Sequence, residues 1–159
     1  MKHTIDRLCS YHSLDRQEYF ELLQCNDIDT MDYLRSQAQS VALERFGRDI
    51  YVRGLIEITN ECRNNCLYCG IRQANKMVAR YSLSQATILD CCRQGYELGF
   101  RTFVLQGGEN PQMTDKWVKD IVAQIHSLYP DCAITLSLGE RSRQAYEAFF
   151  EAGASRYLL

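Results

Sequence analysis

The sequence predicts an α/β fold in which N-terminal helices precede three to four βα units around a parallel sheet. From Ile50 onwards, short apolar runs alternate with amphipathic helical patterns. Each helical pattern closes at a glycine or proline that precedes the next apolar run. A complete eight-fold βα barrel typically takes about 250 residues, so a chain of 159 residues is long enough for only part of such a barrel.

The composition is that of one soluble globular domain, with 46% hydrophobic and 24% charged residues. Its 18 basic and 20 acidic side chains leave a net charge of −2, which excludes an overall attraction to nucleic acid or to an anionic membrane. Charged residues interrupt every apolar run before it reaches the length of a signal peptide or membrane span. We therefore expect a cytoplasmic protein. In that reducing compartment its eight cysteines indicate metal binding or catalysis rather than disulfides.

Residues 1–48 are predicted to form an N-terminal helical segment that contains a lead-in and two helices. Ser13 is the candidate N-cap of the first helix, and Asp29 or Thr30 is that of the second. Gly47 stands where a helix C-cap residue belongs. The apolar stripe of the second helix is interpreted as packing surface.

Residues 49–159 are predicted to form the βα domain, with strands at about 51–58, 102–106 and 133–138. Helices are expected after Ser84, after Thr114 and over about 142–152. The string 153–159 repeats the pattern of 99–105, in which a helix-closing glycine stands three residues before an aromatic-containing apolar strand. The chain is therefore expected to be a fragment that stops inside a fourth strand and leaves a sheet edge for another element to cover.

Three cysteines stand close together directly after the first predicted strand, as Cys62, Cys66 and Cys69 in a C-x3-C-x2-C pattern. Three thiolates in one loop can bind three irons of a cubane iron–sulfur cluster, which leaves the fourth iron open to a small molecule. The side chains of Asn64 and Asn65 and the loop amides are candidate hydrogen-bond donors to the cluster sulfides.

Two other interpretations of the cysteines stay open. A structural zinc site needs a fourth ligand, which would have to come from Cys91, Cys92, Cys132 or His126. Unbound cysteines are also common as small buried hydrophobes. That interpretation is favoured for every cysteine outside the loop.

The cysteine pattern, with an aromatic residue just before its last cysteine, resembles that of the radical S-adenosylmethionine (radical SAM) superfamily. Within it, the chain is similar to the [FeFe]-hydrogenase maturase family HydE, which is related to biotin synthase. The similarity covers residues 50–159 closely. It is carried by Arg53 to Asn60, Cys62 to Arg72, Arg80-Tyr81, Leu105 to Glu109, Thr135 to Glu140, and Gly153 with Tyr157 to Leu159.

This resemblance implies a partial (βα) TIM-type barrel, and the N-terminal helices are in keeping with the family. It implies that Cys62, Cys66 and Cys69 ligate a [4Fe-4S] cluster whose open iron binds S-adenosyl-L-methionine (SAM). Reduction of the cluster then cleaves the sulfonium to give methionine and a 5′-deoxyadenosyl radical.

The resemblance also implies roles in cofactor binding for residues outside the cysteine pattern. Tyr68 would lie by the adenine, and Gly107, Gly108 and Glu109 would meet the methionine amino group. Glycines let the backbone approach a ligand closely, and a carboxylate complements an ammonium group.

Further polar residues stand near the strand ends. Gln106, Thr135 and Ser137 are candidate cofactor-binding residues, with ordinary strand-end polar positions as the alternative. Thr135 and Ser137 alternate so that their side chains share one side of the strand. Basic residues that surround the cysteine motif either neutralise an anionic cluster or form a solvated face; they are Arg53, Arg72, Lys76 and Arg80.

The function implied by the resemblance is an oxygen-sensitive radical SAM enzyme in [FeFe]-hydrogenase H-cluster maturation. Its substrate would be an organometallic or other small molecule, its electron donor a ferredoxin or flavodoxin, and its partners other hydrogenase maturases. The alternatives are a biotin synthase-like or methylornithine synthase-like radical SAM enzyme, or an inactive truncated module that binds a cluster. The 159 residues by themselves are expected to turn over little or nothing.

Overall fold

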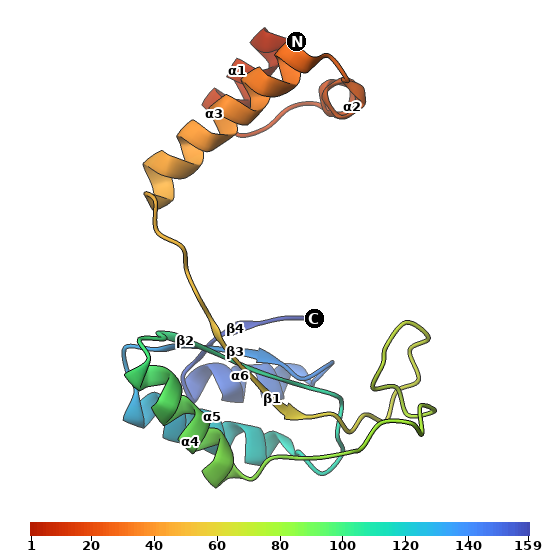
Figure 1. Ribbon diagram of the computed structural model, residues 1–159, viewed down its shortest axis with the longest axis vertical. Coiled ribbons are helices and arrows are strands. Elements are labelled where there is room, and N and C mark those ends of the chain that lie inside the picture. Colours follow the sequence, from red (N-terminus) through yellow and green to blue (C-terminus); the bar gives the residue numbers. More distant parts are fainter. The chain divides into compact units, whose positions relative to one another are not determined.

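The computed structural model describes residues 1–159, which divide into two compact units, Met1–Tyr51 and Val52–Leu159 (Figure 1). The first unit is helical, and the second contains all the strands. None of the helices combines the length and the apolar character needed to cross a membrane.

The unit Met1–Tyr51 contains three helices, α1 (Lys2–Tyr11), α2 (Arg16–Gln24) and α3 (Ile28–Phe46). Its small core is built on Ile5, Leu14 and Leu22, which are all buried. The segment expected as a lead-in is itself helix α1, so the prediction of two helices was wrong.

Helix α2 begins after Asp15, so the prediction that Ser13 caps this helix was also wrong. The Asp15 carboxylate accepts a hydrogen bond from the Glu18 amide at 2.8 Å, and the Glu18 carboxylate accepts one from the Asp15 amide at 3.1 Å. This reciprocal pair satisfies two backbone amides at once, those of Asp15 and Glu18.

Helix α3 begins after Asp27, whose carboxylate accepts a hydrogen bond from the Thr30 amide at 2.9 Å. The expected caps, Asp29 and Thr30, lie inside the first turn of this helix. At the other end Gly47 is the C-cap residue, as predicted, and its amide donates to the Leu43 carbonyl at 2.9 Å.

The unit Val52–Leu159 is built on one parallel sheet in the order β1-β2-β3-β4. Its strands are β1 (Gly54–Thr59), β2 (Thr102–Gly107), β3 (Ala133–Ser137) and β4 (Ala154–Tyr157). Its helices are α4 (Gln85–Glu97), α5 (Asp115–Leu128) and α6 (Arg143–Glu151). The predicted α/β class, as part of a βα barrel, is therefore confirmed.

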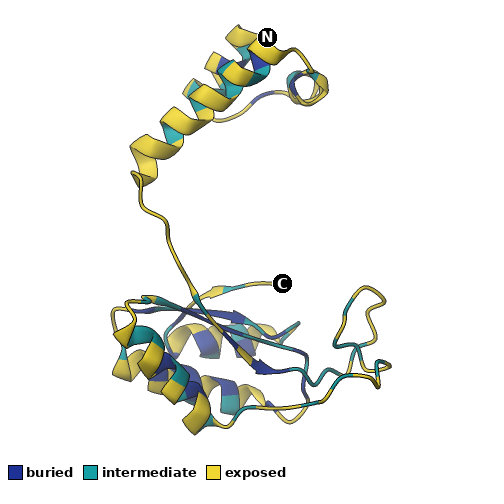
Figure 2. Ribbon diagram, viewed as in Figure 1, coloured by how far each residue is buried: buried dark blue, intermediate teal, exposed yellow.

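One face of the sheet carries the core of this unit, because the three helices cover that face (Figure 1). Alternate strand residues point toward the helices and are buried, which Figure 2 shows as the dark layer between sheet and helices. These strand residues are Ile56, Ile58, Phe103, Leu105, Ile134 and Leu136. Helix residues that pack against them include Ile88, Val118, Ile121 and Phe149.

Two predicted caps of this unit are confirmed: the Ser84 hydroxyl accepts from the Thr87 amide, and the Thr114 hydroxyl from the Trp117 amide. The fourth strand, however, begins at Ala154 rather than at Arg156. Ala154 is buried in the core and pairs with Ile134 of β3, so packing extends the strand toward the preceding glycine.

Candidate metal centre

The cysteine loop, residues 60–84, leaves the carboxyl end of β1 and returns to helix α4 (Figure 1). It is closed at its base by Asn60 and Tyr81. The Tyr81 amide donates to Asn60 Oδ1 at 2.7 Å, and the Asn60 amide donates to the Tyr81 carbonyl at 3.2 Å. The base therefore stands at the edge of the sheet where the parallel strands end.

The three cysteines of the C-x3-C-x2-C pattern lie on this loop and are free thiols. Cys62 and Cys69 are half-buried, whereas Cys66 is exposed. The Asn64 amide donates to Cys62 Sγ at 3.4 Å, and the Cys69 amide donates to the Cys66 carbonyl at 3.0 Å. One loop amide thus already points at a thiol.

The side chains of the two loop asparagines form hydrogen bonds to protein groups, and their donation to cluster sulfides stays a prediction. Asn64 Nδ2 donates to Glu109 Oε1 at 2.8 Å, and Asn65 Oδ1 accepts from the Ala74 amide at 3.2 Å. Both side chains therefore fix the loop and its neighbour, and the contact to sulfur comes from the Asn64 backbone.

No three histidine, cysteine, aspartate or glutamate side chains converge as a single metal ion requires. Two of the candidates for a fourth zinc ligand, Cys92 and Cys132, lie in the hydrophobic core between sheet and helices. Burial raises the pKa of the Cys92 thiol to about 12, which suits an inert thiol. Three thiols spread over one loop fit a cluster, in which each thiolate binds a different iron.

Gly108 brings the end of β2 against the cysteine loop. A Cβ atom on this residue would lie 2.3 Å from the Glu61 carbonyl oxygen and 2.7 Å from Cys62 Cβ. Only glycine leaves room for this approach. The Gly108 amide donates to the Thr59 carbonyl at 3.2 Å, so the glycine pair and the first cysteine belong to one contiguous site.

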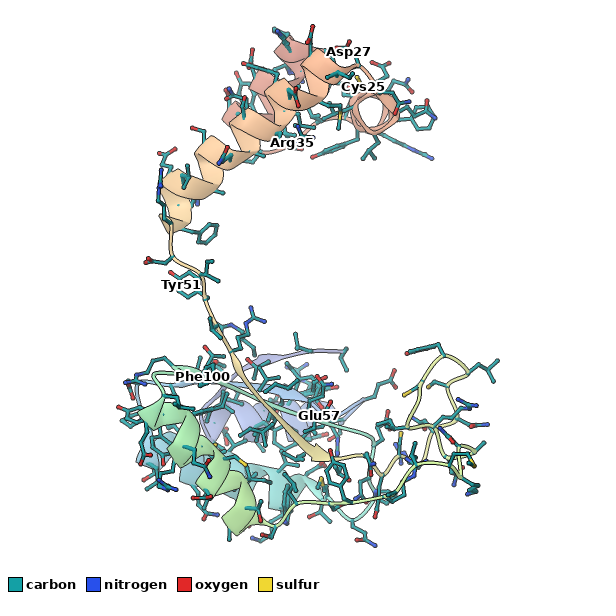
Figure 3. The ribbon with its side chains drawn as sticks, viewed as in Figure 1. Cys25, Asp27, Arg35, Tyr51, Glu57 and Phe100 are labelled. Atoms are coloured by element: carbon teal, nitrogen blue, oxygen red, sulfur yellow. The ribbon has the colours of Figure 1, made fainter.

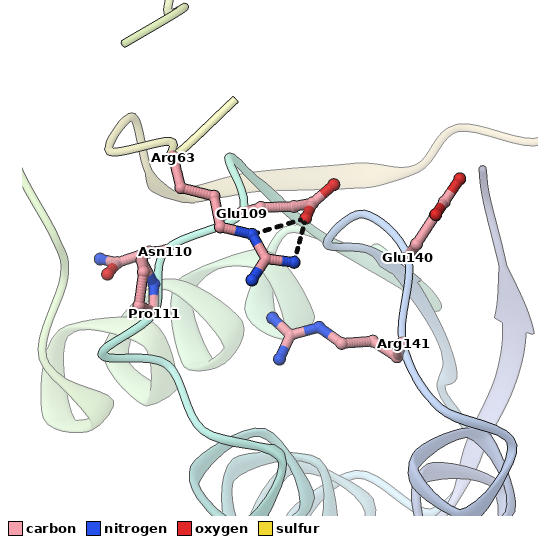
Figure 4. Close-up of a pocket in the computed structure, with 6 residues that line it drawn as sticks. All are labelled: Arg63, Glu109, Asn110, Pro111, Glu140 and Arg141. Carbon is pink, nitrogen blue, oxygen red and sulfur yellow. Dashed lines mark hydrogen bonds and ion pairs between the residues drawn. The ribbon is translucent and has the colours of Figure 1, made fainter. Parts of the chain in front are cut away.

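Glu109 is held by Asn64 and Arg63 of the cysteine loop, and Figure 4 shows its ion pair with Arg63. Arg63 donates to Glu109 Oε2 from Nη2 at 2.9 Å and from Nε at 3.2 Å. The Arg63 amide also donates to the Glu109 carbonyl at 3.0 Å. On the other side, a Cβ on Gly139 would lie 2.5 Å from the Glu109 carboxyl carbon, so this carboxylate is seated against the bare backbone of the loop after β3.

A cavity of about 60 Å³ opens beside this ion pair (Figure 4). It is lined by Arg63, Glu109, Asn110, Pro111, Glu140 and Arg141. Residues of the loops after β1, β2 and β3 therefore share one small cavity at the carboxyl edge of the sheet.

The predicted strand residues lie in register on the sheet face opposite to the helices. Gln106 pairs with Glu57 of β1 and with Ser137 of β3, so these three polar residues form one row across the sheet. Glu57, labelled in Figure 3, is exposed. Thr135 belongs to the next row, between Val104 and Arg156.

The hydroxyl of Thr135 is a buried polar group without a hydrogen-bond partner. The residue is 1% exposed. Such orphaned groups are rare in folded proteins and need a ligand, a water or a functional reason. Tyr68 is the opposite case, because it is 94% exposed on the outer part of the loop.

Sequence reasoning missed four residues that shape this site, namely Arg63, Asn64 as a partner of Glu109, Gly139, and Glu57. Arg63 stands inside the cysteine pattern, so its position was a usable signal. The contact between Gly139 and Glu109, 30 residues apart by their numbers, has no local signature in the sequence.

Comparison with known proteins gives a consistent result. The model of the Radical SAM superfamily matches residues 56–159. The [FeFe] hydrogenase maturase subunit HydE of Thermotoga maritima is 39% identical over 151 residues, which are 92% of this chain and 43% of that protein. The chain thus spans less than half the length of this curated relative.

Solved structures share the fold. The crystal structure of methylornithine synthase (PylB) has a TM-score of 0.83 at 22% identity, over 97% of this chain and 46% of that one. The FeFe-hydrogenase maturase HydG from Carboxydothermus hydrogenoformans has a TM-score of 0.83 at 25% identity, over 98% of this chain and 36% of that one.

Proposed function

This chain belongs to the radical SAM superfamily, and on that premise we propose that its cysteine loop holds a [4Fe-4S] cluster to which SAM binds. The cluster and SAM together supply a one-electron reductive cleavage of the sulfonium, which yields methionine and a 5′-deoxyadenosyl radical. The ligands proposed for the cluster are Cys62, Cys66 and Cys69.

The observation that carries the proposal is the contact between the cysteine loop and the Gly107-Gly108-Glu109 turn. A Cβ on Gly108 would lie 2.7 Å from Cys62 Cβ, and Arg63, next to Cys62, pairs with Glu109. A group held by the cysteines would therefore lie next to the glycine backbone of Gly107-Gly108 and the carboxylate of Glu109. These are suited to a ligand that carries an ammonium group.

The remaining SAM-binding residues are proposed from the sheet face opposite to the helices. The unpartnered hydroxyl of Thr135 is a candidate donor or acceptor for the bound cofactor. Gln106 and Ser137 lie beside one another in the register, and Tyr68, exposed on the loop, is proposed to cover the adenine when SAM is bound.

We further propose that the chain acts in [FeFe]-hydrogenase H-cluster maturation, because 39% identity to the Thermotoga maritima HydE subunit supports that activity. The proposed substrate is a small molecule or organometallic species. The proposed partners are a ferredoxin or flavodoxin as reductant and other hydrogenase maturases.

The cluster proposal is tested by anaerobic reconstitution of this chain with iron and sulfide. We expect about four irons for each chain, and a change in the electron paramagnetic resonance spectrum of the reduced cluster when SAM is added. Ala substitution of Cys62, Cys66 or Cys69 should abolish iron binding, whereas Cys91→Ala, a half-buried thiol on α4, should retain it. A spectrum that ignores SAM would indicate a non-catalytic cluster module.

The maturation proposal needs a separate test. A chimera in which this chain replaces the matching 43% of the Thermotoga maritima HydE subunit should restore hydrogenase activity in cells that lack their own maturase. Rescue of biotin or methylornithine synthesis by an equivalent chimera, without hydrogenase activity, would favour one of those radical SAM enzymes instead.

A further inference from the structure

Arg80 stands at the end of the cysteine loop, and its guanidinium donates to four main-chain carbonyls of that loop. Nη1 donates to the carbonyl oxygens of Asn60 at 2.5 Å and Ile71 at 2.7 Å. Nη2 donates to those of Arg72 at 2.8 Å and Asn75 at 3.0 Å. Arg80 therefore does not belong to a solvated charged face, because its side chain is half-buried and makes four hydrogen bonds to main-chain carbonyls.

These four carbonyls lie on both sides of the cysteines along the chain. Asn60 precedes Cys62, and the other three residues follow Cys69. One side chain therefore joins the two ends of the segment that carries all three thiols. If the Arg80 side chain were removed, these four carbonyl groups would need water or another donor, because each backbone carbonyl is an obligatory acceptor.

The charge of this loop gives a second, independent observation. Residues 62–80 contain four basic side chains and no acidic one. Only Arg63 among them forms an ion pair, with Glu109. Arg72 and Lys76, like Arg80, donate to loop carbonyls instead. The loop therefore carries positive charge that is mostly not neutralised by acidic side chains. This is expected of a loop that encloses an anionic group.

We propose that Arg80 is the positioning residue that clasps the cysteine loop and holds its three thiols in the arrangement that accepts the cluster. Arginine suits this task because its rigid planar fork presents several donors in fixed directions, whereas lysine offers a flexible point charge. The proposal rests on the proposed function only for the identity of the group that the loop holds.

The first experiment needs no cluster. Chymotrypsin is added to the iron-free chain, and the rate of cutting within residues 62–80 is measured at the exposed Leu67, Tyr68 and Met77. We expect Arg80→Gln to raise this rate about tenfold or more, because bonds from a charged donor are lost and the open state becomes more populated. The control Arg93→Gln removes an exposed arginine that pairs with Asp90 and Glu97 on α4, and it should leave the rate unchanged.

The second experiment measures cluster retention after reconstitution. Iron and sulfide content, and the half-life of the cluster absorbance under a chelator, should fall in the order wild type, Arg80→Lys, Arg80→Gln. Arg80→Lys keeps the charge and loses the fork, so a marked defect in this variant supports the clasp. Wild-type behaviour of Arg80→Lys would show that charge is sufficient and would overturn the proposal.

The two experiments separate this inference from the proposed function. Unchanged cutting in the iron-free Arg80→Gln chain would refute the clasp, whatever the cluster does. Faster cutting combined with no response of the wild-type cluster to SAM would leave the clasp standing and would count against the radical SAM activity.

Discussion

The guanidinium of Arg63 binds the carboxylate of Glu109 through two nitrogens, at 2.9 and 3.2 Å from Oε2. Asn64 donates to the other oxygen at 2.8 Å. A carboxylate offers about four lone-pair sites, so these three bonds leave an acceptor site on Oε1. This geometry leaves Glu109 with room for the ammonium group that we propose it binds, without displacement of Arg63, and it orients the carboxylate in advance.

Glu109→Gln is expected to weaken SAM binding about tenfold or more, because the charge-assisted bond to the ammonium is lost. Cluster content should stay at the wild-type level, since Glu109 is not a proposed iron ligand. The measurement is the SAM concentration that half-converts the spectrum of the reduced cluster. Glu140→Gln is the matched control, because Glu140 lines the same cavity and forms no ion pair. An equal loss in both variants would contradict the assignment.

Gly139→Ala is expected to displace the Glu109 carboxylate, because the new Cβ would lie 2.1 Å from Glu109 Cγ. Its positive φ of 74° adds backbone strain of about 1–3 kcal/mol. Gly99→Ala is the matched control, since Gly99 has a φ of 93° and nothing within 4 Å of its Cβ position. Urea unfolding should show a loss of stability in both variants, whereas SAM affinity should fall in Gly139→Ala and stay unchanged in Gly99→Ala.

Thr135→Val removes a buried hydroxyl that has no partner and keeps the shape of the side chain. The ligand-free chain is expected to gain up to about 1–3 kcal/mol in its free energy of unfolding, because an unsatisfied polar group is removed. The same variant should bind SAM more weakly if the hydroxyl serves the cofactor. Stabilisation with unchanged SAM affinity would assign Thr135 no part in binding.

Thr59→Val is the counterpart in the same sheet. The Thr59 hydroxyl donates to the Tyr81 carbonyl at 2.9 Å and lies 2.7 Å from the Ser82 hydroxyl. The same hydroxyl accepts from the Glu61 amide at 3.1 Å. Its removal takes one hydrogen bond from each of these partners and leaves the Glu61 amide without an acceptor, so we expect a loss of about 1–3 kcal/mol. The sign of the change in unfolding free energy should therefore differ between the two threonines.

The buried thiol of Cys92 predicts a dependence of stability on pH. Burial raises the pKa of this thiol from 9.0 to about 12, so from pH 9 to 12 the unfolded chain releases a proton that the folded chain keeps. The contribution of the protonated Cys92 thiol to the free energy of unfolding is intact below pH 9 and is lost as the pH rises toward 12. Urea unfolding of the reduced chain should show a flatter alkaline decline in Cys92→Ala than in the wild type, whereas Cys25→Ala, a half-buried thiol, should keep the wild-type decline.

Local sequence signals predicted the elements of the βα unit better than those of the helical unit. In the βα unit, the alternation of apolar runs and the caps Ser84 and Thr114 were sufficient to predict the elements, because both are local signals. In the helical unit, Ser13 was the predicted cap, and the reciprocal bonds between Asp15 and Glu18 show why the helix begins after Asp15 instead. Arg80 was noted for its charge, while its role as a donor to four carbonyls depends on the folded loop.

The cysteine pattern was enough to indicate the radical SAM superfamily, because the spacing of Cys62, Cys66 and Cys69 is a property of neighbouring residues in the chain. By itself, the sequence also predicted βα units around a parallel sheet, whose strand order, β1-β2-β3-β4, comes from the structure. The tertiary structure decided which residues surround the cysteines. The bonds from Arg63 to Glu109 and the seat of Glu109 on Gly139 join loops that follow three different strands. Such contacts form only when the sheet brings the carboxyl ends of its strands to one edge, which no local pattern encodes.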